Sequence, residues 1–303
     1  MNCDPETGMC EIPGAEEGIA DVKIQADQKP VRLLYFTDPI CSSCWGIEPQ
    51  LRKLKLEFGD YLDIEYRMGG LLQSWNVYGG SDVNGPQSVA QHWEEAGAHY
   101  QMPIDGDVWL EDPLDSSYPP SVAFKAAQLQ GEEIALVFLR RIKEMVFLEK
   151  KNISKWENLK LAAEQCGLNV DQFKTDFETK APALFEADLQ LKREMGVRGF
   201  PTIFFTDKDG NRFLVYGSKP YESYEAALLK LFPQAKKKKY DASAEALFKI
   251  HPTYTTREFA ELSGNNMIES ERRLNDLADA NSISKQEFKN GPLWIKKPSS
   301  HGK

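Results

Sequence analysis

The stretch VRLLYFTDPICSSCW, residues 31–45, decides the fold. Its first six residues are apolar or aromatic apart from one arginine, and they predict a buried strand. A helix is expected from about residue 41 to residue 58, and Pro49 should bend it because proline removes a backbone donor. Cys41 and Cys44 therefore stand where a strand passes into a helix.

A CxxC motif in this position indicates thiol–disulfide chemistry. Cys41 would lie at the helix N-terminus, where unpaired N–H groups and the helix dipole stabilise an anion. We therefore expect the pKa of its thiol to lie below the usual value of about 8.5. Cys41 would attack a substrate disulfide, and the more enclosed Cys44 would resolve the mixed disulfide. Two alternatives remain open: half of a zinc site, although no second CxxC or CxxH occurs in the chain, and an inert pair in a core.

The segments that follow predict the rest of an α/β architecture. A strand at residues 61–67 completes a β-α-β unit, so the first two strands should run parallel. Strands at 202–206 and 212–216 should pair antiparallel and precede a helix at 221–232. Between these halves, residues from about 83 to 195 form a largely helical insert. Its helices are expected at residues 88–100, 121–130, 132–149, 154–165 and 171–195, the fourth opened by a Ser154–Glu157 capping box and the fifth broken near residue 180.

Residues 240–303 predict a small separate module. Helices are expected at 255–263 and 267–280, and residues 283–295 predict a β-hairpin around Asn290-Gly291. Helices followed by a hairpin are the element order of a winged helix. The module holds nine Lys or Arg and nine Asp or Glu residues, and its helix at 267–280 is acidic. We therefore expect protein contact or dimerisation rather than DNA binding.

Composition excludes several classes of protein. The 303 residues include 37 Lys or Arg and 46 Asp or Glu, a net charge of −9, and 11% are aromatic. Such a chain is neither a disordered tail nor, as a whole, a polyanion binder. Its five cysteines are too few for a disulfide-built scaffold.

Cys166, at the end of a predicted helix, is expected to be a small core residue.

The sequence predicts a cytoplasmic location. The first residues, MNCDPE, contain neither the basic nor the apolar region of a secretory signal. No apolar run approaches the roughly 18 residues of a membrane span. In a reducing compartment, paired cysteines indicate redox chemistry or metal binding more often than permanent cross-links.

Residues 31–232 resemble the DsbA-like branch of the thioredoxin superfamily, with its helical insert. The resemblance is closer to the cytosolic FrnE-type dithiol oxidoreductases, and closer still to the bacterial ClpXP adapter family that delivers the regulator Spx for degradation. The segment DPICSSCW, residues 38–45, is similar to that family's Asp-Pro-x-Cys-x-x-Cys-Trp pattern, and Glu48-Pro49 fits it too. The C-terminal module is also similar. The resemblance implies an α/β, thioredoxin-like, DsbA-like domain at residues 31–234 with a helical insertion, followed at 240–303 by a winged-helix-like α+β module.

The resemblance assigns roles at the site. It implies Cys41 as nucleophile, Cys44 as resolving thiol and Pro201 as a cis-proline facing Cys41. A cis Phe200–Pro201 bond would expose the backbone of Phe200 to an extended substrate strand, whereas the alternative is an ordinary trans proline at a strand start. Trp45 is either core packing or a substrate-facing wall.

The N-terminal arm, residues 1–30, departs from the adapter family. That family's arm is rich in histidine and cysteine and is associated with zinc, whereas this arm has Cys3, Cys10 and no histidine. Turn-forming residues between the two cysteines could bring the thiols together. A second redox pair, a metal half-site shared between chains and unpaired cysteines in a loosely attached tail all remain open.

Two functions of different classes follow. The first is a cytosolic thiol–disulfide oxidoreductase that acts on protein or small thiol and disulfide substrates through the CxxC motif. The second is an adapter that delivers a regulator to a ClpXP-type protease, with the thioredoxin fold as a binding platform. We expect no cofactor, metal, nucleic acid or membrane partner for either.

Overall fold

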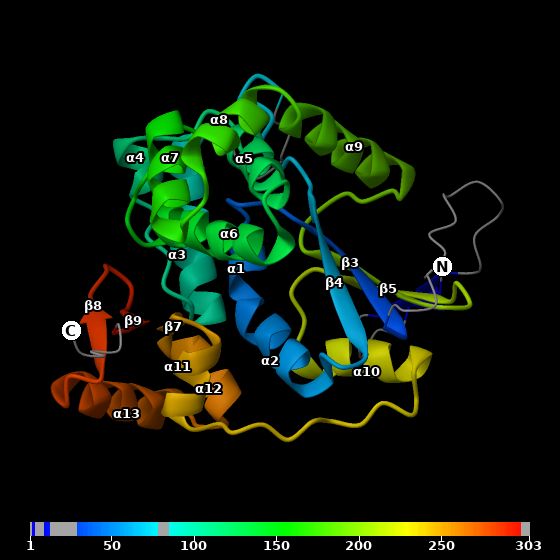
Figure 1. Cartoon of the computed structure of the whole chain (residues 1–303), viewed down its shortest axis with the longest axis vertical. Coiled ribbons are helices and arrows are strands. Elements are labelled where there is room, and N and C mark those ends of the chain that lie inside the picture. Colours follow the sequence, from blue (N-terminus) through cyan, green and yellow to red (C-terminus); the bar gives the residue numbers. More distant parts are fainter. Residues whose placement is uncertain (1, 4–8, 13–28, 78–84, 298–303) are drawn as a thin grey trace.

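The strand predicted at residues 31–36 is β3 (Val31–Thr37), and it forms part of a six-stranded sheet in the computed structural model (Figure 1). The structure describes residues 2–3, 9–12, 29–77 and 85–297. β3 runs parallel to β4 and antiparallel to β5, with Tyr35 opposite both Tyr66 and Ile203. The parallel β-α-β start is thus confirmed. The strand order is β1-β2-β6-β5-β3-β4, and the bounds are Asn2–Cys3 (β1), Met9–Ile12 (β2), Leu62–Met68 (β4), Thr202–Asp207 (β5) and Arg212–Tyr216 (β6).

Side-chain alternation along β3 gives the sheet two apolar faces. Leu33 and Tyr35 pack into a core with helices α2 (Glu48–Phe58) and α10 (Tyr221–Leu231). Phe36, on the other face, packs with Val197 and Phe204. The sheet therefore has hydrophobic layers on both sides, which is the thioredoxin-like arrangement that was expected.

The helical insert forms its own core above the carboxyl end of β3 (Figure 1). The break expected near residue 180 is present, and a short helix at Val108–Glu111 was not predicted. The capping box at Ser154 is wrong, because the hydroxyl of Ser154 donates to the Asn152 side chain and Lys155 is the residue before the helix. The helices are Pro86–Tyr100 (α3), Val108–Glu111 (α4), Tyr118–Gln128 (α5), Glu132–Phe147 (α6), Trp156–Cys166 (α7), Val170–Glu178 (α8) and Ala181–Glu194 (α9).

The N-terminal arm contributes two strands to the sheet, although the sequence predicted a loosely attached tail. β2 pairs antiparallel with β6 and extends the sheet beyond the predicted strands. β1 pairs antiparallel with β2, so that Cys3 lies opposite Cys10 in the backbone register. The remainder of the predicted arm, residues 1, 4–8 and 13–28, lies outside the described residues.

The C-terminal module has the predicted order of helices and the predicted hairpin, together with an additional strand before the second helix. A Thr255–Glu258 capping box opens α12, and β8 and β9 form the hairpin. The winged-helix assignment stays a prediction. The elements are Ala244–Ile250 (α11), Thr253–Thr255 (β7), Thr256–Ser263 (α12), Met267–Asp279 (α13), Ile283–Gln286 (β8) and Leu293–Lys296 (β9). Among the described residues, no helix combines the length and the apolar character that crossing a membrane requires.

A buried ion-pair network joins this module to the insert and to α2. The Arg140 guanidinium binds both Glu258 carboxylate oxygens, at 2.6 and 3.0 Å, and also contacts Glu144. Arg52 lies 3.3 Å from the same Glu258 side chain, which has no exposed surface. Burial by itself would raise the pKa of Glu258, but the charges of Arg140 and Arg52 outweigh it and hold the pKa at about 2.

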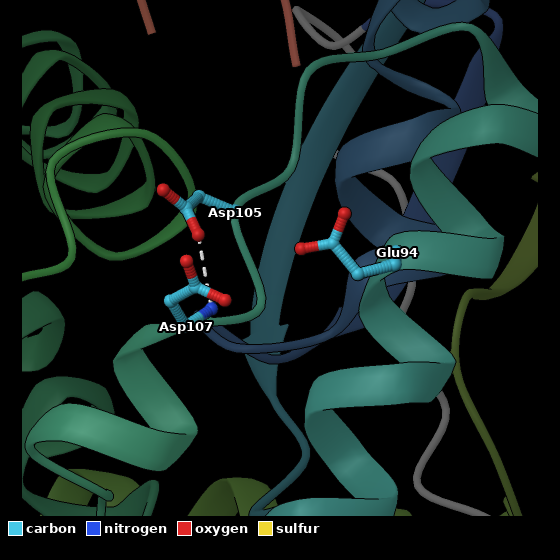
Figure 2. A group of neighbouring side chains, drawn as sticks. All are labelled: Glu94, Asp105 and Asp107. Carbon is cyan, nitrogen blue, oxygen red and sulfur yellow. Dashed lines mark hydrogen bonds between the residues drawn. The ribbon is translucent and has the colours of Figure 1, made fainter. Parts of the chain in front are cut away.

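A second contact joins the module hairpin to the insert. Glu94, Asp105 and Asp107 gather their carboxylates within 4.8 Å of one another (Figure 2). Lys289 places its ammonium 3.0 Å from Glu94 and 2.8 Å from Asp107, and Asn290 donates to Glu94. The module therefore places one positive charge and one amide donor against the three carboxylates, and the cluster serves as a docking contact.

We expect Glu258→Gln to destabilise the folded protein by about 3 kcal/mol, because it removes the buried carboxylate that pairs with Arg140 and Arg52. The free energy of unfolding in urea measures the loss, and proteolysis of the segment between α10 and α11 reports undocking of the module. Glu245→Gln, at an exposed position of α11, is the matched control and should change neither. Since the pKa of Glu258 is lowered on folding, its contribution is present above about pH 4.3 and is lost as the pH falls towards 2. Equal stability of the two variants would contradict this role.

Candidate functional site

The CxxC motif is positioned by the turn that ends β3. The Asp38 backbone carbonyl accepts the Cys41 N–H at 3.1 Å, and the Asp38 carboxylate accepts the Ile40 N–H at 3.1 Å. Helix α1 (Ser42–Gly46) follows, with Cys41 as its N-cap residue. Pro49 stands in the first turn of α2, so the predicted single helix is divided in two at Ile47.

Cys41 and Cys44 are brought together as predicted. Both are free thiols, and the Cys44 N–H donates to the Cys41 sulfur at 3.1 Å. Only 5% of Cys41 is exposed, and Cys44 has no exposed surface. The outer and inner positions expected for the two thiols are therefore present.

The electrostatic expectation for Cys41 is wrong. Burial, the hydrogen bond to the Cys44 side chain and the nearby Asp38 carboxylate raise the pKa of the Cys41 thiol well above its ordinary value, and the single backbone donor does not offset them. Burial also acts to raise the pKa of Cys44. There it is outweighed by the neighbouring Cys41 thiol, by the positive charge of Lys143 and by the hydroxyl groups of Thr37 and Tyr35, so that the pKa of Cys44 is lowered.

Asp38 links the motif to two other parts of the chain. Its carboxylate accepts the Leu71 N–H at 2.7 Å and the Ser117 hydroxyl at 2.8 Å, and it has no exposed surface. Burial raises the pKa of Asp38 to about 6, although its hydrogen bonds oppose the change. A buried carboxyl group that titrates near neutral pH thus lies beside Cys41.

An apolar groove of about 180 Å³ opens at Cys41. The Phe200–Pro201 peptide bond is cis, as predicted, and Phe200 forms part of the groove wall. Gly69 makes room for this ring, because a Cβ at Gly69 would lie 2.0 Å from it. The groove is lined by residues from the CxxC turn, the segment after β4, the insert and the proline loop, namely Ile40, Cys41, Ser42, Ser43, Leu71, Leu72, Trp75, Val89, His92, Trp93, Trp109 and Phe200.

Trp45 does not face this groove, which corrects its assignment as a substrate-binding residue. It has no exposed surface, and it stacks on Phe147 at a centroid distance of 5.4 Å. Its indole N–H donates to the Pro103 carbonyl at 3.0 Å, and Arg140 lies 4.4 Å above its ring. The side chain is therefore core packing, the other interpretation of the sequence.

Cys166 is distant from the motif in sequence. Cys166 is half-buried at the end of α7, where burial raises the pKa of its thiol to about 11. This agrees with the expected structural role. Cys3 and Cys10 are placed only by their backbone register.

Sequence reasoning missed the polar residues that act to lower the pKa of Cys44. Lys143 has a fully buried side chain in α6 and pairs with Glu48 at 2.7 Å. Its burial left no signal in the sequence, because Lys143 stands in a charged stretch of the helix, beside Arg140, Arg141 and Glu144. Tyr35 and Thr37 gave no signal either, since both suit a buried strand.

A family model for thioredoxin matches residues 34–226. The fold and the site thus define a thioredoxin-like protein. The solved cytosolic disulfide reductase DsbM from Pseudomonas aeruginosa is 23% identical, with a TM-score of 0.54, and the match covers 66% of this chain and 99% of that one. This likeness concerns the fold alone.

Two curated relatives extend over most of the chain. The ClpXP adapter protein SpxH of Halalkalibacterium halodurans is 36% identical over 97% of this chain and 96% of its own length. The ClpXP adapter protein SpxH of Bacillus subtilis is 30% identical over 88% of this chain and 89% of its own. The chain belongs to the thioredoxin family and, within it, to the family of ClpXP adapter proteins named SpxH.

We expect Asp38→Asn to increase the reactivity of Cys41 towards a small disulfide reagent near neutral pH, because it removes a negative charge that opposes the thiolate. In the unchanged protein, the pH profile of Cys41 labelling should show an inflection near pH 6, where Asp38 ionises. The variant should lose that inflection. Labelling of Cys41 is followed by peptide mass spectrometry, with the exposed Asp63→Asn as control. An inflection that persists in Asp38→Asn would contradict the assignment.

Proposed function

We propose that this protein is a proteolytic adapter that delivers a regulator to a ClpXP-type protease, with the thioredoxin fold as its binding platform. The observation that carries the proposal is the length of the likeness to the SpxH relatives. The thioredoxin model ends at residue 226, whereas the first of these relatives aligns over 97% of the chain. The likeness therefore extends into the C-terminal module, which lies outside the thioredoxin domain that carries the CxxC motif.

The docking of that module supports a single binding platform. Buried Glu258 and the Lys289 contacts hold the module against the insert rather than leaving it on a free tether. An adapter works by raising the local concentration of its cargo at the protease, which requires a defined arrangement of two binding surfaces. We place this activity in the cytoplasm, where proteases of this type and reduced thiols coexist.

The test is degradation of purified Spx by purified ClpXP, with and without the full-length protein. We expect the protein to accelerate degradation by at least about tenfold through effective concentration. The Cys41→Ser, Cys44→Ser double variant should retain the acceleration if the fold acts as a platform. Degradation that is no faster at any concentration of the protein would refute the adapter function.

A second candidate function is thiol–disulfide exchange at the CxxC motif. It is supported by the free Cys41–Cys44 pair, by the groove that opens at Cys41 and by the loop of Phe200 and Pro201 in the groove wall. Cys41 would act as nucleophile and Cys44 as resolving thiol, with Phe200 contacting the substrate. The apolar lining favours a protein substrate with an apolar segment beside its cysteine.

Trapping in cells tests this candidate. In Cys44→Ala the resolving thiol is absent, so protein partners should accumulate as disulfides to Cys41 and be released by reductant. The Cys41→Ala, Cys44→Ala double variant is the matched control and should trap none. If Cys44→Ala yields no more mixed disulfide than this control, exchange at the motif is refuted.

We propose a second redox pair at Cys3 and Cys10. Direct partners in an antiparallel ladder have Cα atoms about 4.5–5.5 Å apart, within the range of a disulfide. Mass spectrometry of the protein after incubation with oxidised glutathione should find a Cys3–Cys10 linkage. Exclusive modification of separate thiols would speak against it.

A further inference from the structure

We propose that the cavity between α2, α6 and the C-terminal module is a binding site for a small carboxylic acid with an apolar body, such as a medium-chain fatty acid. The cavity has a volume of about 320 Å³, at the lower end of the range of small-molecule sites. It shares no lining residue with the groove at Cys41, so the inference depends on neither proposed function.

Three parts of the chain build the wall of this cavity. The thioredoxin-like domain contributes α2 and β4, the insert contributes α6 and the end of α7, and the module contributes residues 251–253. The parts meet here because Glu258 of the module pairs with Arg52 of α2 and with Arg140 of α6. Small-molecule sites occur preferentially at such junctions between domains.

Aliphatic side chains from all three parts line the cavity, and they can bury the hydrocarbon body of a ligand. Val137 of α6 is 48% exposed while it lines the cavity, so the place where the cavity opens to solvent is itself apolar. The aliphatic lining residues are Leu51, Ile64, Leu136, Val137, Leu139 and Pro252.

Three polar side chains of the wall have unused hydrogen-bonding capacity. The Tyr66 hydroxyl, the His251 imidazole and the Lys55 ammonium make no hydrogen bond with other side chains or backbone groups of the described residues. Tyr66 and His251 are half-buried, and enclosed polar groups of this kind normally have a partner. A carboxylate would offer these donors two acceptor oxygens.

The fixed charge of the wall favours an anion. Both lining carboxylates already have a partner, since Glu48 pairs with Lys143 and Glu144 with Arg140, each at 2.7 Å. Lys55 has no such partner among the described residues. When the direct ion-pair partners Lys143, Glu149 and Glu258 are included, five positive charges face four negative ones. The basic lining residues are Arg52, Lys55, Arg140 and Arg141.

His251 does not change this balance. Burial, followed by the positive charge of Arg52, lowers the pKa of its imidazole to about 3, so the ring is neutral at physiological pH. In a chain with a net charge of −9, a wall with one positive charge in excess is a local exception that suits a monoanion.

The position of the cavity couples its occupant to the docking of the module. Pro252 and Thr253 complete the wall only when the module lies against α2 and the insert. A ligand that binds this docked arrangement must also stabilise it, because linkage is reciprocal.

The experiment is calorimetric titration of the full-length protein with octanoate, and with 1-octanol as an uncharged ligand of the same chain length. We expect octanoate to bind at one saturable site. Octanol should bind at least about tenfold more weakly, because it lacks the charge-assisted hydrogen bonds.

Variants of the wall test where octanoate binds. Lys55→Met should weaken its binding about tenfold, and Tyr66→Phe, which keeps the ring, about fivefold. Val137→Trp should abolish binding because the indole fills the opening of the cavity. Lys174→Met, at an exposed position of α8, is the matched control and should leave the affinity unchanged.

Proteolysis of the segment between α10 and α11 gives a second readout. Octanoate should slow cleavage in the unchanged protein and leave it unaltered in Val137→Trp. Equal affinities for octanoate and octanol, or octanoate binding that survives Val137→Trp, would identify an adventitious additive only and overturn the proposal. The absence of saturable octanoate binding at millimolar concentration would overturn it as well.

Discussion

The position of the Arg140 guanidinium is the constraint on which the rest of the structure depends. It binds Glu258 of the C-terminal module, contacts Glu144 of its own helix and lies over the ring of Trp45 beside the CxxC motif. One planar cation therefore touches the module, the insert and the helix that carries Cys44. Because a buried charge is tolerated only when its partners are in place, the three parts can be fully packed only together.

The contacts of Arg140 hold the helical insert and the C-terminal module against the thioredoxin-like sheet. The insert in turn helps to fix the position of the CxxC motif. Ser117 and Leu71 bind Asp38 from the insert and from the segment after β4. The Tyr100 hydroxyl donates to Ser43 within the motif. The CxxC turn is thus held by hydrogen bonds from elements that are distant in the sequence, and the insert forms part of the wall of the groove at Cys41.

Much of this arrangement could be predicted from local pattern. The apolar strand at β3, the turn before Cys41 and the antiparallel pair β5–β6 each have a strong local signal, and the cis Phe200–Pro201 bond followed from the resemblance once their order was known. The direction of the pKa shift of Cys41 could not be predicted in this way. The local argument counted the helix N-terminus, whereas burial and the Asp38 carboxylate, which depend on tertiary packing, outweigh it. Trp45 shows the same limit, because its neighbours Phe147 and Pro103 come from the insert and nothing near it in sequence reveals its burial.

The pairing of β2 with β6 has a consequence for the surface of the molecule. Without the N-terminal arm, β6 would be an outer strand with unpaired backbone donors and acceptors, which is a template for pairing with another chain. β1 and β2 add two strands to that side of the sheet, so these strands protect β6 against edge-to-edge association. Their sequence can vary widely while they do so, since main-chain hydrogen bonds, rather than particular side chains, do the covering.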